Sequence, residues 1–384
     1  MKKFLVFLIL ISAMVVANRL YAADGVTDTE IKLGMVNAQT GGAAGLGNGM
    51  RVGAEAFFKE ANAKGGILGR KINLVVADDG YEPDKAIDQT LKMIEGQKVF
   101  ALFGYVGTPT ANAVIPIVKE DKVPLVGLFT GAMTLRNPVT HEIINIRASY
   151  NDEPEMLIEH FVKDTGAKKF AVFYQDDGFG QAVLSGTEKA LKKRGLDVVA
   201  KGTFQRNTLA VKTGLASVMA ANPDVVIMVG PYSPIGVFIK EAKTDGLKAH
   251  LATVSFVGTD DLVSAVGKEG DGVVISQVVP FPEDPSVPII KECGTLITKY
   301  FPDQKTGFVN MEGCITAKVM CMALEKAGKD LTRDGLINAF EDMKNVDIGG
   351  MVLSLGKDNH QASNTVFLTE IKDGKIVPIT TISN

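Results

Sequence analysis

The stretch IKLGMVNAQTGGAAGLGNGMRV, residues 31–52, decides how the fold begins, because it reads as a strand, a glycine-rich loop and a helix in succession. We expect the strand at 31–36 and the helix at 51–63. A dinucleotide-binding loop would have the spacing G-x-G-x-x-G and an acidic residue at the end of the next strand. The glycines at 42, 45, 47 and 49 do not follow that spacing, so the loop alone is a weak indication of nucleotide binding.

The same strand–loop–helix unit repeats along the chain. Further strands are expected at 72–77, 99–103, 124–128, 169–174, 197–202, 225–229 and 273–279, and helices at 83–94, 154–164, 179–193 and 234–244. Strict alternation of strands and helices predicts parallel sheets with helices on both faces. A mature chain of about 360 residues exceeds what one hydrophobic core usually serves. The sequence therefore predicts an α/β fold with two similar lobes.

The amino end, MKKFLVFLILISAMVVANRLYAADG, is typical of a secretory signal peptide cleaved near Ala22 or Ala23. No cysteine follows its apolar run, and no later run reaches the roughly 18 apolar residues of a membrane span. We therefore expect a periplasmic protein. Removing residues 1–22 moves the formal charge from -3 to about -6, which argues against nucleic acid and anionic membrane surfaces as partners.

The three cysteines are too few for a disulfide scaffold. Cys314 and Cys321 lie seven residues apart on an expected helix, about 10.5 Å along its axis, so they should not pair with each other. Cys293 can pair with Cys314 in an oxidising compartment, and two buried free thiols are an equal alternative.

The sequence offers no pattern typical of catalysis. The four histidines are scattered, and H-E-x-x-H, a zinc spacing, G-x-S-x-G and a Walker A loop are all lacking. We therefore expect no enzyme activity, no metal and no cofactor.

The loops that follow the strands of the first half are rich in glycine and threonine and carry no charge. They are 39–42, 104–110 and 129–132. Ligands of open α/β sheets bind at the carboxyl ends of the strands, where these loops lie. Thr108 is predicted to be a helix N-cap with Pro109 at the first helical position, which would leave N–H groups for an anion. Plain capping is the alternative to a small carboxylate held by hydroxyls and backbone amides.

The loops of the second half supply carboxylates and aromatic rings instead. They are 150–153, 175–179, 231–233 and 255–258. Such groups would complement an ammonium group and an apolar body. Asp152, Asp176 and Asp177 can also be N-caps or solvated loop residues, and for the last two this is the favoured interpretation.

Several motifs together resemble one family. They are ANAKGGILGRKINLVVADDGYEP (61–83), GYVGTPTANA (104–113), KVPLVG (122–127), NIRASYNDE (145–153), DGFGQ (177–181) and GLDVV (195–199). Over residues 24–375 the chain is similar to the solute-binding proteins of branched-chain amino-acid ABC transporters, which have the type I periplasmic binding fold. The resemblance implies two Rossmann-like lobes with parallel sheets, joined by a three-strand hinge and closing on a ligand between them.

The resemblance also implies domain bounds and partners. The N-terminal lobe would comprise 23–149 and 278–355, and the C-terminal lobe 150–277 and 356–384. The protein would act as a monomer that delivers a small solute to an inner-membrane ABC permease. The alternative is a sensor that presents the solute to a membrane signalling receptor.

By resemblance, Thr108 would donate to the ligand carboxylate together with the backbone amides of 129–132. Asp152 would face a ligand ammonium and Tyr232 would close the pocket. Ser255 stands where the family has a second acid, and Leu46 where it has an aromatic residue, so an amino acid and an acid without an amine both remain open. The glycines of 39–52 would let the backbone approach the ligand. The full predicted set is Thr40, Leu46, Tyr105, Thr108, Phe129, Thr130, Gly131, Ala132, Tyr150, Asp152, Tyr232 and Ser255.

Overall fold

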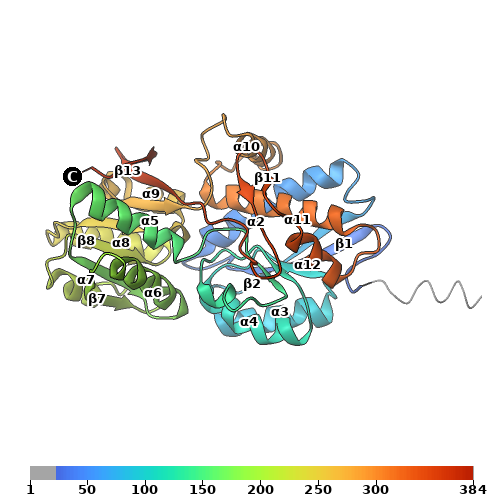
Figure 1. Ribbon diagram of the computed structural model, residues 1–384, viewed down its shortest axis with the longest axis horizontal. Helices are drawn as coiled ribbons and strands as arrows, with labels where there is room; N and C mark the ends of the chain where they lie inside the picture. The colour runs from blue at the N-terminus through green and yellow to red at the C-terminus, as the bar shows by residue number, and fades with distance from the viewer. Residues whose placement is uncertain (1–22, 384) are drawn as a thin grey trace, which may run out of the picture.

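The computed structural model describes residues 23–383, which form two α/β lobes side by side (Figure 1). The predicted signal peptide, residues 1–22, lies outside the described residues. None of the helices between residues 23 and 383 combines the length and the apolar character that crossing a bilayer requires. The predicted α/β fold with two lobes is confirmed.

The first lobe is built on a five-stranded parallel sheet of order β2-β1-β3-β4-β5. Its strands are β1 (Glu30–Asn37), β2 (Lys71–Asp78), β3 (Ala101–Phe103), β4 (Leu125–Val126) and β5 (Ile143–Ile144). Between them lie α2 (Ala44–Ala63), α3 (Pro83–Leu91), the π-helical turn η1 (Lys92–Gly96), α4 (Thr108–Glu120) and, after β4, the short helix η2 (Met133–Leu135). The chain later returns to this lobe with α10 (Pro288–Tyr300), α11 (Phe308–Ala327), α12 (Arg333–Glu341), β11 (Val346–Asp347) and β12 (Val352–Leu353), drawn in orange and red in Figure 1.

The second lobe has a seven-stranded sheet of order β14-β13-β10-β9-β8-β6-β7. Its parallel strands are β6 (Phe170–Gln175), β7 (Val198–Phe204), β8 (Val225–Val229), β9 (His250–Thr253) and β10 (Val274–Gln277). Its helices are α5 (Asp152–His160), η3 (Phe161–Thr165), α6 (Gly178–Lys192), α7 (Lys212–Met219), α8 (Tyr232–Thr244), η4 (Ser255–Val257), α9 (Thr259–Val266) and η5 (Gly267–Gly270). An antiparallel hairpin, β13 (Phe367–Lys372) and β14 (Lys375–Ile379), completes one edge.

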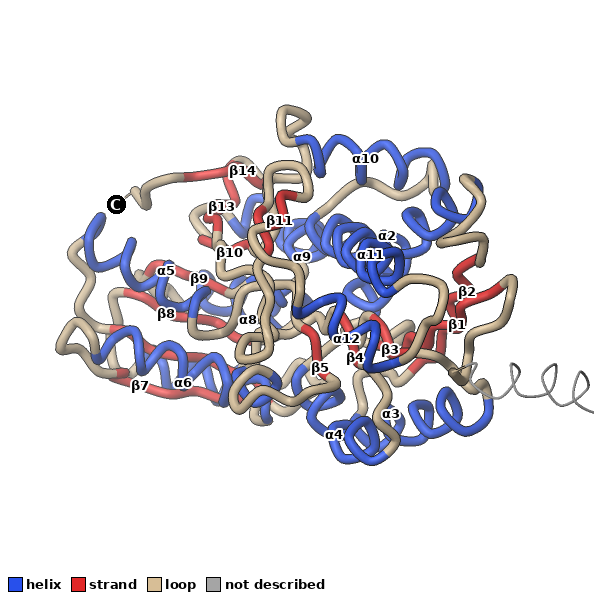
Figure 2. Tube along the Cα trace, turned by 45° about the vertical axis from the view of Figure 1, so that its right-hand side comes forward, coloured by secondary structure: helices blue, strands red, loops and turns tan. Residues whose placement is uncertain are grey.

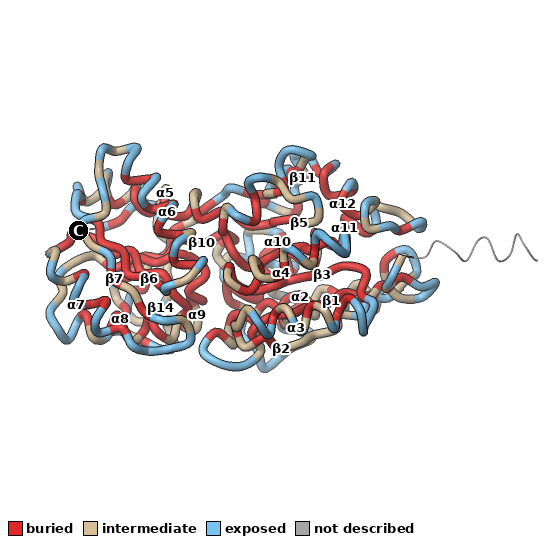
Figure 3. The backbone as a smooth tube through the Cα atoms, turned by 90° about the horizontal axis from the view of Figure 1, so that it is seen from below, coloured by how far each residue is buried: buried red, intermediate tan, exposed pale blue. Residues whose placement is uncertain are grey.

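Strand β6 shows why these apolar runs form central strands. Successive side chains of a strand point to opposite faces of the sheet. Phe170 and Val172 pack in one hydrophobic cluster with Leu157 of α5, whereas Phe173 packs in another with Phe238 of α8. Each fully buried side chain of this size contributes about 1.5–3 kcal/mol through burial. Figure 3 shows the strands of both sheets as the buried centre of each lobe.

The glycines of the opening stretch have a different role from the one predicted. The helix α2 begins at Ala44 rather than at residue 51, so Gly47 and Gly49 lie inside it. A Cβ at Gly47 would lie 1.8 Å from the carbonyl oxygen of Ala38, and one at Gly49 would lie 2.7 Å from Val309 of α11. Figure 2 shows α2 and α11 packed side by side. The predicted approach of these two glycines to a ligand is therefore wrong, because they serve close packing within the lobe.

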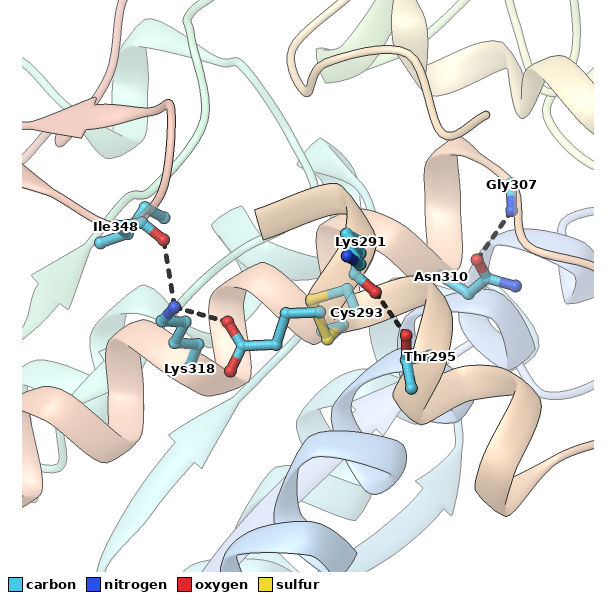
Figure 4. The surroundings of a disulfide bond; sticks show 9 residues. Lys291, Cys293, Thr295, Gly307, Asn310, Lys318 and Ile348 are labelled. Atoms are coloured by element: carbon cyan, nitrogen blue, oxygen red, sulfur yellow. Dashed lines mark hydrogen bonds and ion pairs between the residues drawn. A yellow bond between two sulfur atoms is a disulfide. The ribbon is translucent and has the colours of Figure 1, made fainter. Parts of the chain in front are cut away.

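The open question about the cysteines is answered by a disulfide between Cys293 of α10 and Cys314 of α11, with Cα atoms 5.8 Å apart (Figure 4). Cys321 is a buried free thiol. Beside the disulfide, the Lys318 ammonium donates to Glu292 at 2.7 Å and to the Ile348 carbonyl at 3.0 Å. This part of the first lobe is thus fixed covalently as well as by packing.

Three chain segments connect the lobes, namely 145–151, 278–287 and 354–366. Two of them pair as a short parallel bridge. The Asn145 N–H donates to the His360 carbonyl, and the Ala362 N–H donates to the Asn145 carbonyl, each at 2.8 Å. The joint between the lobes is therefore narrow and hydrogen-bonded.

Candidate functional site

Aromatic side chains from both lobes meet between the lobes. The Phe256 ring centroid lies 4.4 Å from that of Phe179, 5.6 Å from Phe129 and 6.0 Å from Tyr81. Tyr150 joins them at 5.4 Å from Phe179. Tyr81 and Phe129 follow strands of the first sheet, whereas Phe179 and Phe256 follow β6 and β9 of the second. We call these five buried residues the aromatic cluster, and it lies where the carboxyl ends of both sheets face each other.

A pair of buried hydroxyls includes that of Thr130, which follows the cluster residue Phe129 in the sequence. The Thr108 and Thr130 oxygens are 2.7 Å apart, and both side chains are buried. The prediction that Thr108 is an N-cap is wrong, because α4 begins at Thr108 and the N-cap is Gly107 with φ 101°. The Thr108 hydroxyl is consequently free of capping and bonds across to the loop that carries Phe129.

Tyr81 is held in an unfavourable backbone conformation. Its φ is 62°, in the left-handed region that bulky residues avoid at a cost of about 1–3 kcal/mol. The Asp79 carboxylate accepts from the Tyr81 N–H at 2.8 Å, and Gln175 of the other lobe donates to its hydroxyl at 3.2 Å. A Cβ at Gly107 would lie 2.2 Å from the ring. Such over-determined strain is characteristic of functional sites.

A buried ion-pair network centred on Arg147 lies next to the aromatic cluster. The guanidinium is 3.2 Å from the Glu153 carboxylate and 3.5 Å from that of Glu312, and it also bonds the Ser255 hydroxyl. It stacks over the Phe129 ring, 4.7 Å from its centroid. Burial raises the pKa of Glu312 to about 7. Burial also opposes the charge of Arg147, but its two acids prevail and raise its pKa.

A second arginine, Arg136, is buried among backbone carbonyls. Within residues 23–383 its guanidinium donates only to the carbonyl oxygens of Ala132, Thr130 and Arg147, at 3.0–3.3 Å. Burial lowers its pKa to about 9. Carbonyl oxygens of the loop 129–132 point toward Arg136. The Arg136 guanidinium therefore places a fixed positive charge next to this loop.

The lobes also meet at the rim of this region. The Tyr232 hydroxyl accepts from the Gly45 N–H at 3.2 Å, across the lobes. Leu46 is fully buried, and a Cβ at Gly258 would lie 2.6 Å from it. The first turn of α2 therefore contacts the second lobe, as the predicted cleft wall would.

Two predicted residues lie apart from the aromatic cluster. Thr40 is exposed, and its hydroxyl donates to Asp78 at the end of β2. Tyr105 is buried in the first lobe, where its hydroxyl pairs with that of Thr90 at 2.8 Å. Both positions support loops of the first lobe.

Asp152 also faces away from the cluster. One of its oxygens accepts from the N–H and hydroxyl of Ser149 at 2.8 and 2.6 Å and from Gln361 at 2.9 Å. Its side chain lines a hollow of about 370 Å³ beside two of the connecting segments, together with Lys189 and Lys193. The geometry gives no support to a contact between Asp152 and an ammonium in the cluster.

Sequence reasoning missed several residues of this site. Arg147 and Glu153 lay within the motif NIRASYNDE, and Phe256 within the loop 255–258, but none was selected. The sequence did offer one signal for Arg147, because this charged residue lies between the apolar residues Ile146 and Ala148 just after a buried strand. Arg136, by contrast, lies between Leu135 and Asn137 in a polar stretch, where nothing distinguishes it from a surface residue.

A family model described as "Periplasmic binding protein" matches residues 30–375. The chain belongs to this family. The resemblance inferred from the motifs is thereby confirmed, and the family and its fold are those of binding proteins.

Solved and curated proteins agree with this assignment. The binding protein is 33% identical to a possible leucine/isoleucine/valine-binding protein from Rhodopirellula baltica, with a TM-score of 0.88 over 94% of this chain and 98% of that one. It is 26% identical to an amino acid binding protein of Pseudomonas aeruginosa, over 67% of this chain and 68% of the relative. It is 27% identical to Leu/Ile/Val-binding protein homolog 7 of Brucella abortus, over 60% of this chain and 59% of the relative.

Proposed function

We propose that this binding protein captures a small carboxylate-bearing solute between its lobes and delivers it to an inner-membrane ABC permease. The amino end, with its two lysines, apolar run and small-residue exit, supports export to the periplasm. The relatives named for amino acids support a ligand of that size. The protein would act as a monomer whose lobes close around the solute.

The proposal depends on one observation. Aromatic rings, hydroxyls and polar atoms that lack hydrogen-bond partners within residues 23–383 lie together in a buried region between the lobes. Within residues 23–383 the Nε of Arg147 is buried without a hydrogen-bond partner, and the buried Tyr150 hydroxyl lies beside Thr130 and Gly131. Buried polar groups are normally paired, so such atoms at one place favour a polar ligand group there. Thr108, Thr130 and the N–H of Gly131 would complete a set of donors for a carboxylate.

Ligand binding is tested by a thermal-shift screen of the refolded mature protein with amino acids and with aliphatic and aromatic acids. A ligand at about 100 times its dissociation constant should stabilise the folded state by roughly 2.7 kcal/mol. If no carboxylate shifts the melting temperature, the proposed ligand class is wrong.

The transport role is tested by deleting the gene and measuring uptake of the solute found in the screen. Loss of uptake is the expected result. Unchanged uptake together with a lost signalling response would contradict transport and favour the sensor role.

A further inference from the structure

We infer that the solute is an aromatic monocarboxylate without an ammonium group, an inference that rests on the proposed function and narrows it. The argument begins with the buried charges around the aromatic cluster. Arg136 and Arg147 are two buried cations, and the facing buried acids are Glu153 and Glu312. Glu312 has a pKa of about 7 and so carries only part of a charge near neutral pH.

The balance of these four groups favours an anion. Arg136 has no acidic partner within residues 23–383, because its bonds go to backbone carbonyls. A buried charge is costly unless it is compensated. A ligand carboxylate in front of the loop 129–132 would compensate this surplus cation, whereas an ammonium would add a further positive charge.

Glu153, the acid that pairs with Arg147, is already fully engaged. One oxygen of Glu153 accepts from Arg147 at 3.2 Å and from the Ser255 hydroxyl at 3.0 Å. The other accepts from the Ser255 N–H at 2.8 Å and from the Ser276 hydroxyl at 2.7 Å. These four hydrogen bonds use the accepting capacity of the carboxylate. Ser255 therefore serves Glu153 instead of a ligand amine.

Two further acids at the lobe boundary are also committed. Asp152 accepts from Ser149 and Gln361 outside the cluster. Asp177 caps α6 through the Phe179 N–H at 2.9 Å and pairs with Arg206 at 3.1 Å. Neither offers a carboxylate to an ammonium between the lobes.

Asp79 and Asp261 are the acids at the lobe boundary that an amine-bearing ligand could use. Within residues 23–383 the Oδ2 of Asp79 is buried without a partner, while its other oxygen accepts from the Tyr81 N–H. Burial raises the pKa of Asp79 to about 7, and an ammonium beside it would lower that pKa and restore the charge, so Asp79 is a position where a ligand amine would be detected. The variant Asp79→Asn therefore distinguishes the two ligand classes directly.

The five rings of the aromatic cluster favour a ring in the ligand. Their centroid separations of 4.4–6.0 Å and tilted planes are those of favourable aromatic pairs. A planar ring can join such a set by offset stacking or edge-to-face contact, whereas a branched aliphatic chain gains only apolar burial. We therefore expect aromatic acids to bind more tightly than aliphatic acids of similar size.

The test uses pairs of probes that differ only in the amine. 3-Phenylpropanoate is compared with L-phenylalanine, and 4-methylpentanoate with L-leucine, by calorimetry on the refolded mature protein. 3-Phenylpropanamide serves as the uncharged control. We expect 3-phenylpropanoate to bind about tenfold or more tightly than each of the other four probes.

The outcomes separate the inference from the proposed function. If L-phenylalanine or L-leucine binds as tightly as its amine-free counterpart, the inference is overturned while the carboxylate-binding function stands. If 4-methylpentanoate binds as tightly as 3-phenylpropanoate, the aromatic part is overturned. If the amide binds as well as the acid, or if no probe binds, the inference and the proposed ligand class both fail.

Two variants test independently whether an acid of the protein contacts a ligand ammonium. Asp79→Asn and Asp152→Asn should each leave the affinity for 3-phenylpropanoate within about threefold of the unmodified protein, because neither acid meets an ammonium. A loss of more than about tenfold in amino-acid affinity in either variant would show an ammonium contact and overturn the inference.

Discussion

At the scale of single residues, the hydroxyl pair of Thr108 and Thr130 gives the most direct test of the proposed carboxylate site. Thr108→Val keeps the shape but leaves the Thr130 hydroxyl without its partner. We expect ligand affinity to fall by about 1–3 kcal/mol, or roughly 5- to 150-fold, by calorimetry. Thr110→Val is the matched control, because the Thr110 hydroxyl bonds only backbone carbonyls of Val106 and Gly107. Equal losses in both variants would contradict a ligand contact at Thr108.

Asp79 predicts a pH dependence of stability. Its pKa is about 7 in the folded protein and 3.8 in an unfolded chain, so the folded state binds the proton more tightly. Its contribution is therefore fully present below pH 3.8 and is lost as the pH rises through 7. Asp79→Asn keeps an acceptor for the Tyr81 N–H and removes the buried charge.

We expect the stability gain of Asp79→Asn to grow from pH 4 to pH 8 and to reach about 1–3 kcal/mol. Urea unfolding at several pH values measures it. A gain that is independent of pH would show that Asp79 does not titrate in this range.

The roles of single residues were the hardest part to predict from the sequence. Asp152 and Glu153 are neighbours at the start of α5, and successive residues of a helix point about 100° apart. Which of the two acids faces the interior depends on where the helix begins, and the residue types alone do not fix this. The structure turns Glu153 inward, and Asp152 lies beside the connecting segments.

At the scale of helices and strands, the predictions from sequence were better. Central strands such as β8 coincide with the predicted 225–229, because strands buried on both faces read as unbroken apolar runs. The terminal hairpin of β13 and β14 was missed, although Asp373 and Gly374, with φ 51° and 68°, form the kind of two-residue turn that joins antiparallel strands. This antiparallel hairpin departs from the regular β–α alternation on which the predicted elements were based.

The contact of α2 with α11 depends on glycines on both helices. A Cβ at Gly53 would lie 1.8 Å from the Asn310 carbonyl, and one at Gly313 would lie 2.3 Å from the Met50 carbonyl. Gly53→Ala should therefore lower the free energy of unfolding by about 1–3 kcal/mol, because the helices must separate.

The matched control is Gly294→Ala in α10, whose Cβ would meet only Thr306 at 3.7 Å. It should be neutral or stabilising by up to about 1 kcal/mol, as helix propensity alone predicts. Chemical denaturation compares the two variants, and equal effects would contradict the packing argument.

At the scale of the whole molecule, the second lobe supplies helix caps to the first. The N-cap of α11 is Gly307, which has no side chain to cap the helix. Asp260 of α9 reaches across from the other lobe and accepts from the Phe308 N–H at 2.9 Å. The N-cap of α2 also lacks a side-chain bond, and there Tyr232 accepts from Gly45. Contact between the lobes thus satisfies helix ends that water would hydrate if the lobes were apart.

This arrangement predicts a variant that opposes closure without disturbing either lobe. Gly307 has φ -155°, an extended conformation open to any residue, and the atoms nearest to its Cβ would be those of the Asp260 carboxylate, the first at 2.3 Å. Gly307→Ala should displace Asp260 from α11 and weaken ligand binding by about 0.5–2 kcal/mol, the value of a helix cap, with little change in melting temperature. Gly356→Ala, with nothing near its Cβ, is the control. Adding Asp260→Ala to Gly307→Ala removes the clash between the new methyl group and the carboxylate. The double variant should therefore bind the ligand no more weakly than Asp260→Ala alone. Calorimetry measures the affinity, and small-angle scattering measures closure of the lobes. Strictly additive losses in the double variant would mean that Asp260 and Gly307 do not meet when the ligand binds.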